Sequence, residues 1–176
     1  MNAKDEYEGI VYEETQRFTQ WWIRFLLGAA VACVWFWFVQ QIFFDRPFGN
    51  KPASNEAMIV IWLSVGILLP LIFLSCNLQL QVRRDGFYYR FRPFQLKMKV
   101  IRFEEIQSYE AVTYRPILEY GGWGMRYGIH GRAYNISGNR GLRMKLTNGK
   151  RILFGSAKPE ELKLNLDVMM GRYTKK

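Results

Sequence analysis

The residues most able to do chemistry in this sequence are basic, and they crowd into one short stretch. Seven of them lie within 20 residues: Arg83, Arg84, Arg90, Arg92, Lys97, Lys99 and Arg102. Such a cluster attracts anionic surfaces, including lipid phosphates, by long-range electrostatics. The alternative interpretation is that the charges form an ordinary solvated face.

Residues that usually carry catalysis or bind metals are sparse. His130 is the only histidine, which excludes a site built from several histidines and leaves little for a Ser–His–Asp triad. Glu104 and Glu105 are adjacent, so in a strand their carboxylates point apart. Glycines recur in residues 121–131 without the strand–GxxxxGK–helix context of a phosphate-binding loop. We therefore expect no catalytic residue, no cofactor, no metal and no enzymatic activity.

The positive charge is confined to the second part of the chain. Residues 1–76 hold five Lys/Arg and seven Asp/Glu, and subtracting these from the totals of 25 and 15 leaves 20 basic and eight acidic residues after position 76. Binding of nucleic acid suits this charge, but it does not suit the membrane segments described next. The sequence therefore predicts no nucleic-acid partner.

Two long apolar segments precede the basic part. Residues 23–44 carry one charge, Arg24 at their start, and residues 57–76 carry none. About 20 apolar residues suffice for a helix to cross a bilayer, so both segments are predicted transmembrane helices. Pro70 removes the backbone hydrogen bond to Gly66 and predicts a kink in the second helix.

The distribution of charge predicts the topology. Residues 45–56 form a short loop with two basic residues, whereas the region after the second helix holds 20. The positive-inside rule places the loop outside and both termini in the cytoplasm. A cleaved signal peptide and a lipoprotein box ending at Cys33 both fit poorly, because the first 20 residues are acidic and the apolar run continues past Cys33.

The segment before the first membrane helix, residues 1–22, is predicted to be cytoplasmic and helical. Tyr7, Val11, Phe18 and Trp22 recur at multiples of three to four residues, as on one face of a helix.

Residues 77–176 are predicted to form a cytoplasmic, mainly β domain. Alternating apolar residues indicate strands within 78–83, 87–92, 96–103, 106–114, 127–136, 142–147 and 151–155. Asp85-Gly86 and Asn148-Gly149 are hairpin signals. Pro159, followed by two glutamates, favours a helix over residues 159–170. The total is seven strands and one C-terminal helix.

This order resembles the pleckstrin-homology superfold, a bent seven-stranded sheet or barrel closed by a C-terminal helix. The motifs GWGMR at 122–126, AYNISGNRG at 133–141 and NGKR at 148–151, with PEEL at 159–162, are similar to those of small bacterial membrane proteins that carry a pleckstrin-homology-like domain after a two-helix hairpin. The resemblance covers roughly residues 120–165. It implies the architecture and a bacterial inner membrane, and it implies no activity.

These features favour a non-enzymatic, membrane-anchored interaction or scaffold module that binds a protein partner or a second copy of itself at the inner leaflet. The alternative is a domain that senses anionic lipid headgroups through its first hairpin. The residues predicted to face the membrane are Arg83, Arg84, Arg90, Arg92, Lys97 and Lys99. The segment predicted to bind a partner contains Trp123, Arg126, Tyr134, Asn135 and Arg140.

Overall fold

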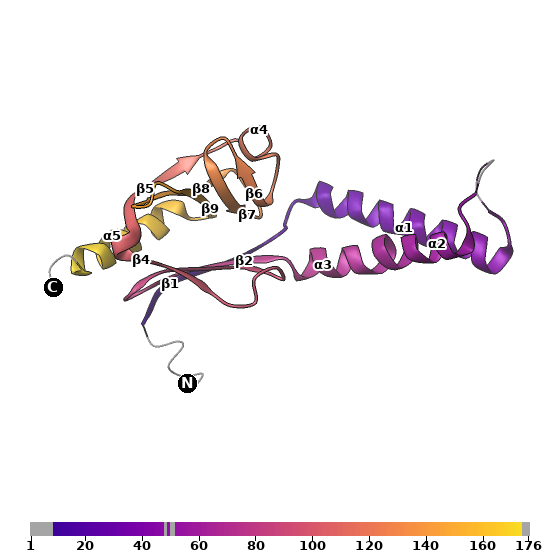
Figure 1. Cartoon of the computed structure of the whole chain (residues 1–176), viewed down its shortest axis with the longest axis horizontal. Helices are drawn as coiled ribbons and strands as arrows, with labels where there is room; N and C mark the ends of the chain where they lie inside the picture. Colours follow the sequence, from indigo (N-terminus) through magenta and orange to yellow (C-terminus); the bar gives the residue numbers. More distant parts are fainter. Residues whose placement is uncertain (1–8, 48, 50–51, 174–176) are drawn as a thin grey trace. The chain divides into compact units, whose positions relative to one another are not determined.

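The computed structural model describes residues 9–47, 49 and 52–173, and it divides into two compact units. One unit is the apolar segment Phe18–Cys76. The other combines Met1–Arg17 with Asn77–Lys176. Figure 1 shows the helical character of the first unit and the two sheets of the second.

The apolar unit contains two helical segments long and apolar enough to cross a membrane. The first is α1, Trp21–Phe44. The second runs without interruption through α2, Asn55–Ile61, the π-helical η1, Trp62–Leu68, and α3, Leu69–Ser75. The prediction of two apolar helices is confirmed.

The second helix is irregular just before Pro70. The backbone N–H of Leu69 donates to the carbonyl of Ser64, five residues earlier, which is the π-helical pattern. The usual α-helical donor to the Gly66 carbonyl would be residue 70, and proline has no N–H. The indole Nε1 of Trp35 donates to that carbonyl instead, at 3.2 Å. Trp35, from the first helix, thus supplies the hydrogen bond to the Gly66 carbonyl that Pro70 cannot donate.

In the β unit, four antiparallel strands form the first sheet, sheet A, in the order β1-β2-β3-β4. Their bounds are Ile10–Arg17, Asn77–Arg83, Gly86–Arg92 and Lys99–Arg102. A 3₁₀ turn, η2, Phe103–Glu105, leads to the second sheet.

The second sheet, sheet B, has the order β5-β8-β9-β7-β6. Its strands are β5 Ile106–Thr113, β6 Gly124–Gly128, β7 Gly131–Asn135, β8 Arg140–Leu146 and β9 Arg151–Gly155. Only the β7–β9 pair is parallel. The short helix α4, Pro116–Tyr120, follows β5, and the C-terminal helix α5 is Pro159–Tyr173.

The prediction of a helix before the membrane segment is wrong for residues 10–17, which form strand β1. Arg17 pairs with Asn77, and the ladder continues to Ile10 opposite Arg83. The inward side chains of Glu14 and Gln16 bind polar partners, so the apolar alternation of this strand is limited to Ile10 and Tyr12. The part of that prediction before residue 9 lies outside the described residues.

The predicted seven strands become nine among the described residues. Besides β1, the predicted strand in 127–136 is two strands, β6 and β7, joined by a turn that ends at Gly131. Gly131 has a φ of 101° and faces the Arg151 carbonyl, so glycine is required there. The predicted strand at 96–103 shortens to β4, whereas the predicted C-terminal helix is confirmed by α5.

The inner faces of the two sheets form the core. The ring of Phe87 lies 4.8 Å from that of Phe154, and the ring of Tyr89 lies 5.0 Å from that of Tyr134, measured between centroids. From α5, Leu162 and Leu166 are fully buried. Helix α5 therefore completes the same apolar interior.

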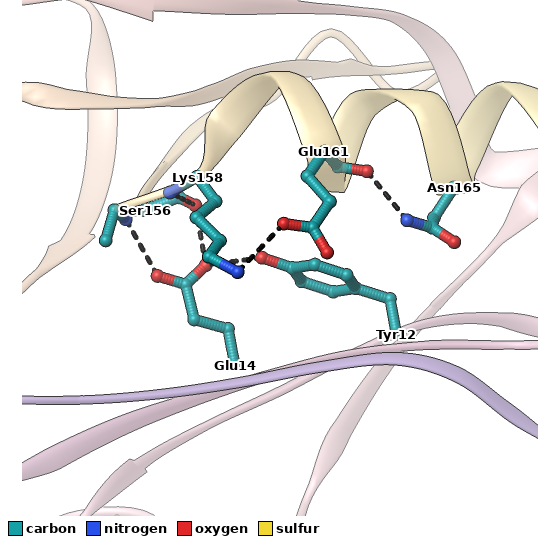
Figure 2. A network of polar contacts seen from close by, with 7 residues as sticks. Tyr12, Glu14, Ser156, Lys158, Glu161 and Asn165 are labelled. Atoms are coloured by element: carbon teal, nitrogen blue, oxygen red, sulfur yellow. Dashed lines mark hydrogen bonds and ion pairs between the residues drawn. The ribbon is translucent and has the colours of Figure 1, made fainter.

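A polar network joins β1 to the start of α5 (Figure 2). The Glu14 carboxylate accepts hydrogen bonds from the Ser156 hydroxyl at 2.6 Å and the Ala157 N–H at 2.7 Å. It also accepts one from the Tyr12 hydroxyl at 2.9 Å. Burial, together with this carboxylate, raises the pKa of Tyr12 above its usual range. Residues from opposite ends of the sequence are thus fixed together.

Candidate anion-binding surfaces

The alternation of β2 and β3 places several predicted basic residues on the outer face of sheet A. Leu78, Leu80 and Val82 are fully buried on the inner face, so Arg83 lies on the other side. Its guanidinium donates to Gln81 Oε1 and lies 4.3 Å from the centroid of the Tyr88 ring.

Arg90 lies on the same outer face and is also held by the protein. It donates from Nε to Gln79 Oε1 at 2.9 Å and from Nη1 to the Leu96 carbonyl at 3.2 Å. Of the predicted membrane-facing set, Arg83 and Arg90 are therefore partly occupied, whereas Arg84, Arg92, Lys97 and Lys99 are exposed.

The predicted basic cluster is divided between the two ends of the hairpin. Arg83 and Arg84 lie at the β2–β3 turn, beside Asp85. Arg92 lies at the opposite end, where it pairs with Asn77. Asn77 directly follows Cys76, the last residue of the apolar unit. The basic residues lie close together in the sequence, so sequence spacing alone does not predict that they separate to the two ends of the hairpin.

The segment predicted to bind a partner is divided between surface and core. Tyr134 and Asn135 are buried, with exposed fractions of 1% and 0%. The side-chain Oδ1 of Asn135 accepts a hydrogen bond from the Gly124 N–H at 3.0 Å. These two residues are structural, and the prediction that they face a partner is wrong for the domain as folded.

The other three residues of that segment lie nearer the surface. Trp123 is half-buried and donates from its indole to the Gly138 carbonyl at 2.9 Å. Arg126 is exposed, and its guanidinium donates to the Trp123 carbonyl. Arg140 is exposed and forms an ion pair with Glu160. None of the three lines the two pockets described next.

A concave basic site lies elsewhere, on sheet B. This pocket has a volume of about 300 Å³ and is lined by Ser108, Tyr109, Glu110, His130, Arg143, Met144, Lys145 and Arg151. We call it the sheet B pocket. Strands β5, β8 and β9 supply most of the lining, and the β6–β7 turn supplies His130.

The pairing of β8 with β9 sets two cations side by side. Lys145 is the direct cross-strand partner of Arg151. Like charges in opposing positions of a sheet destabilise it. Within the described residues, neither side chain has an ion pair with an acid. An anion bound between them would relieve this repulsion.

Acidic residues balance only part of the positive charge. Arg143 lies 3.4 Å from a Glu110 oxygen and 3.7 Å from a Glu119 oxygen. The lining thus holds three Lys/Arg against the single carboxylate of Glu110, a balance of 3 − 1 = +2 with His130 neutral. The excess belongs to the Lys145–Arg151 pair.

A second pocket, of about 320 Å³, shares Arg151 with the first and extends the basic surface. It is lined by Tyr127, Gly131, Arg132, Lys150, Arg151 and Ile152. Arg132 lies 4.5 Å from the centroid of the Tyr127 ring.

One sequence pattern indicates that Lys145 and Arg151 lie close together. The Asn148-Gly149 turn predicts a hairpin, and a tight hairpin brings the residues flanking its turn together. The contribution of His130 from a separate turn has no comparable signal.

The architecture defines a class: a two-sheet β domain with a C-terminal helix, attached to a pair of apolar helices of membrane-spanning length. Residues 4–172 match DUF6141, a family of unknown function, and the chain belongs to that family. No curated protein and no solved structure matches the chain.

Proposed function

We propose that this chain is a non-enzymatic, membrane-anchored interaction module that binds an acidic segment of a protein partner in the sheet B pocket. The two apolar helices cross a bacterial inner membrane as a hairpin with both termini in the cytoplasm. The basic β domain then lies at the inner leaflet, where the positive-inside rule puts positive charge.

The domain is of the pleckstrin-homology-like type in this proposal. Two sheets packed on one core, with α5 completing the interior, support that assignment. Strand β1, contributed from before the first apolar helix, is an addition to the expected seven-stranded pattern.

The observation that carries the proposal is the unpaired juxtaposition of Lys145 and Arg151 in a concave site. Carboxylates form charge-assisted hydrogen bonds with both side-chain types, and arginine can bind them in a bidentate manner. Ser108 adds a hydroxyl donor to the lining, and His130 adds an imidazole. An acidic peptide side chain matches this set of donors.

Anchoring is supported by the pairing of β1 with β2. Only Phe18, Thr19 and Gln20 separate β1 from α1, and only Cys76 separates α3 from β2. The chain therefore enters and leaves the apolar unit from two paired strands without a long flexible linker. A partner bound to the domain would be held close to the bilayer.

A direct experiment measures binding of a fluorescent decaglutamate peptide to the full chain in nanodiscs of zwitterionic lipid. The double variant Lys145→Glu/Arg151→Glu should bind at least about tenfold more weakly, because about 1.4 kcal/mol of lost attraction suffices for that change. The matched control, Arg84→Glu/Arg102→Glu, changes the net charge equally at one end of sheet A, at the β2–β3 turn and in β4. Equal losses of affinity in both variants would show that the peptide binds by non-specific charge attraction, which would contradict a specific site in the sheet B pocket.

The second candidate function is recognition of anionic lipid headgroups by the first hairpin. The observation that favours it is the position of Arg92 opposite Asn77, the first residue after the apolar unit in the sequence. The same peptide assay separates the candidates, because a domain that recognises only lipid headgroups would show no peptide binding that depends on Lys145 and Arg151.

A further inference from the structure

The loop between β3 and β4, residues 93–98, carries two exposed apolar side chains. Phe94 is 60% exposed and Leu96 is 83% exposed. In the strands on either side, Phe91 and Ile101 are buried. Two exposed side chains of this size, separated by one residue in the same loop, indicate a surface that another molecule covers.

Strand register fixes where this loop leaves the sheet. Arg17, Asn77 and Arg92 are successive partners across β1, β2 and β3. Arg17 precedes the apolar unit and Asn77 follows it. The loop begins immediately after Arg92, so it starts in the same row of the sheet as both connections to the membrane helices.

Hydrogen bonds hold the loop in a defined shape. The backbone N–H of Gln95 donates to the Phe91 carbonyl at 2.8 Å, and the Gln95 side chain accepts from the Phe91 N–H at 3.0 Å. Arg90 donates to the Leu96 carbonyl. The apolar side chains are therefore presented by an ordered loop and lose little conformational freedom on binding.

The charged residues that flank the apolar tip in the sequence are all positive. Arg92, Lys97 and Lys99 flank Phe94 and Leu96, and each is exposed. Apolar side chains flanked by lysine and arginine match the interface of an anionic bilayer, where rings and aliphatic groups enter the acyl boundary and cations contact phosphates. A soluble acidic partner would leave the apolar pair without a matching environment.

We infer that the β3–β4 loop is a membrane-contact site, in which Phe94 and Leu96 insert into the headgroup region of an anionic leaflet while Arg92, Lys97 and Lys99 bind lipid phosphates. This rests on the membrane anchoring in the proposed function, but not on the sheet B pocket. The contact adds a third attachment to the two covalent ones and limits how the domain rotates over the bilayer.

The test uses an environment-sensitive fluorophore on the full chain in nanodiscs. Cys33→Ala and Cys76→Ala remove the native thiols, and Leu96→Cys or, separately, Phe94→Cys receives a nitrobenzoxadiazole label. With 30% phosphatidylglycerol, both labels should show blue-shifted emission and be quenched by spin-labelled lipid at least about threefold more than a label at Asp85→Cys, which lies at the opposite end of the β2–β3 hairpin.

A triple variant tests the contribution of the three positive charges to membrane contact. Arg92→Gln/Lys97→Gln/Lys99→Gln should reduce quenching of the Leu96→Cys label, as should replacing phosphatidylglycerol with phosphatidylcholine. Water-like emission from both loop labels in anionic nanodiscs would overturn the inference, and so would quenching indifferent to lipid charge and to the glutamines. Release of the chain from cell membranes by alkaline carbonate would instead show that the anchoring itself fails.

Discussion

Arg17 and Asn77, which bracket the apolar unit in the sequence, are direct partners in adjacent antiparallel strands. The whole helical pair is thus an insertion between two strands of sheet A. Strand pairing therefore brings the two ends of the insertion together in one row of sheet A. Glu14 in β1 holds this strand against the start of α5 through its hydrogen bonds with Ser156 and Ala157.

Glu14→Gln should lower the free energy of unfolding of the β domain by about 2 kcal/mol, because the carboxylate receives charge-assisted hydrogen bonds from Ser156 and Ala157. Thermal unfolding of the purified chain in detergent measures the change. Glu160→Gln, which removes an exposed ion pair with Arg140, should cost less than about 0.5 kcal/mol. Equal effects of the two substitutions would show that the Glu14 network contributes no special stability.

Gly86→Ala should destabilise the domain by about 1–3 kcal/mol through overpacking. A Cβ at this position would lie 2.7 Å from the Ile101 carbonyl oxygen. The matched control is Gly171→Ala in α5, where a Cβ meets no atom within 4 Å and the change should be neutral or stabilising. A Gly86→Ala domain that melts at the wild-type temperature would contradict the packing of β3 against β4.

Trp35→Phe should weaken the packing of the two apolar helices by about 1 kcal/mol, since it leaves the Gly66 carbonyl without the indole donor. Unfolding in mixed micelles of increasing dodecyl sulfate content reports the loss. Trp21→Phe alters a side chain that is 76% exposed and serves as the control. Identical behaviour of the two variants would mean that the indole bond is not needed beside Pro70.

Two reporter fusions test the predicted membrane topology. One fused after Lys176 should be active only in the cytoplasm, and one inserted at Gly49 only outside. The expectation follows from the basic excess after the second helix. A cytoplasmic Gly49 reporter would eliminate the membrane hairpin.

Local signals predicted the parts of the fold that depend on neighbouring residues. Asn148-Gly149 predicted the hairpin of β8 and β9, and Gly149 has the positive φ of 80° that such a turn requires. Pro159 predicted the start of α5. Asp85-Gly86 was less accurate, because Gly86 begins β3 with an ordinary φ and is required for close approach to β4.

Long-range pairing accounts for most of what the sequence did not reveal. The partner of β1 lies beyond two membrane-length helices, and the inward positions Glu14 and Gln16 are polar because they bind Ser156 and Gly155. The sheet B pocket likewise needs His130 from a distant turn. The basic cluster was visible in the sequence, but its division between two ends of a hairpin follows from strand register.

The central claim is that the sheet B pocket binds an acidic partner at the membrane. The most direct measurement places a photocrosslinking amino acid at Tyr109, in the pocket lining, in the full chain in native membranes. A defined adduct should form, and Lys145→Glu/Arg151→Glu should abolish it while Arg84→Glu/Arg102→Glu leaves it intact. An adduct that survives reversal of the pocket charges, or is lost equally with the sheet A charges, would contradict the claim.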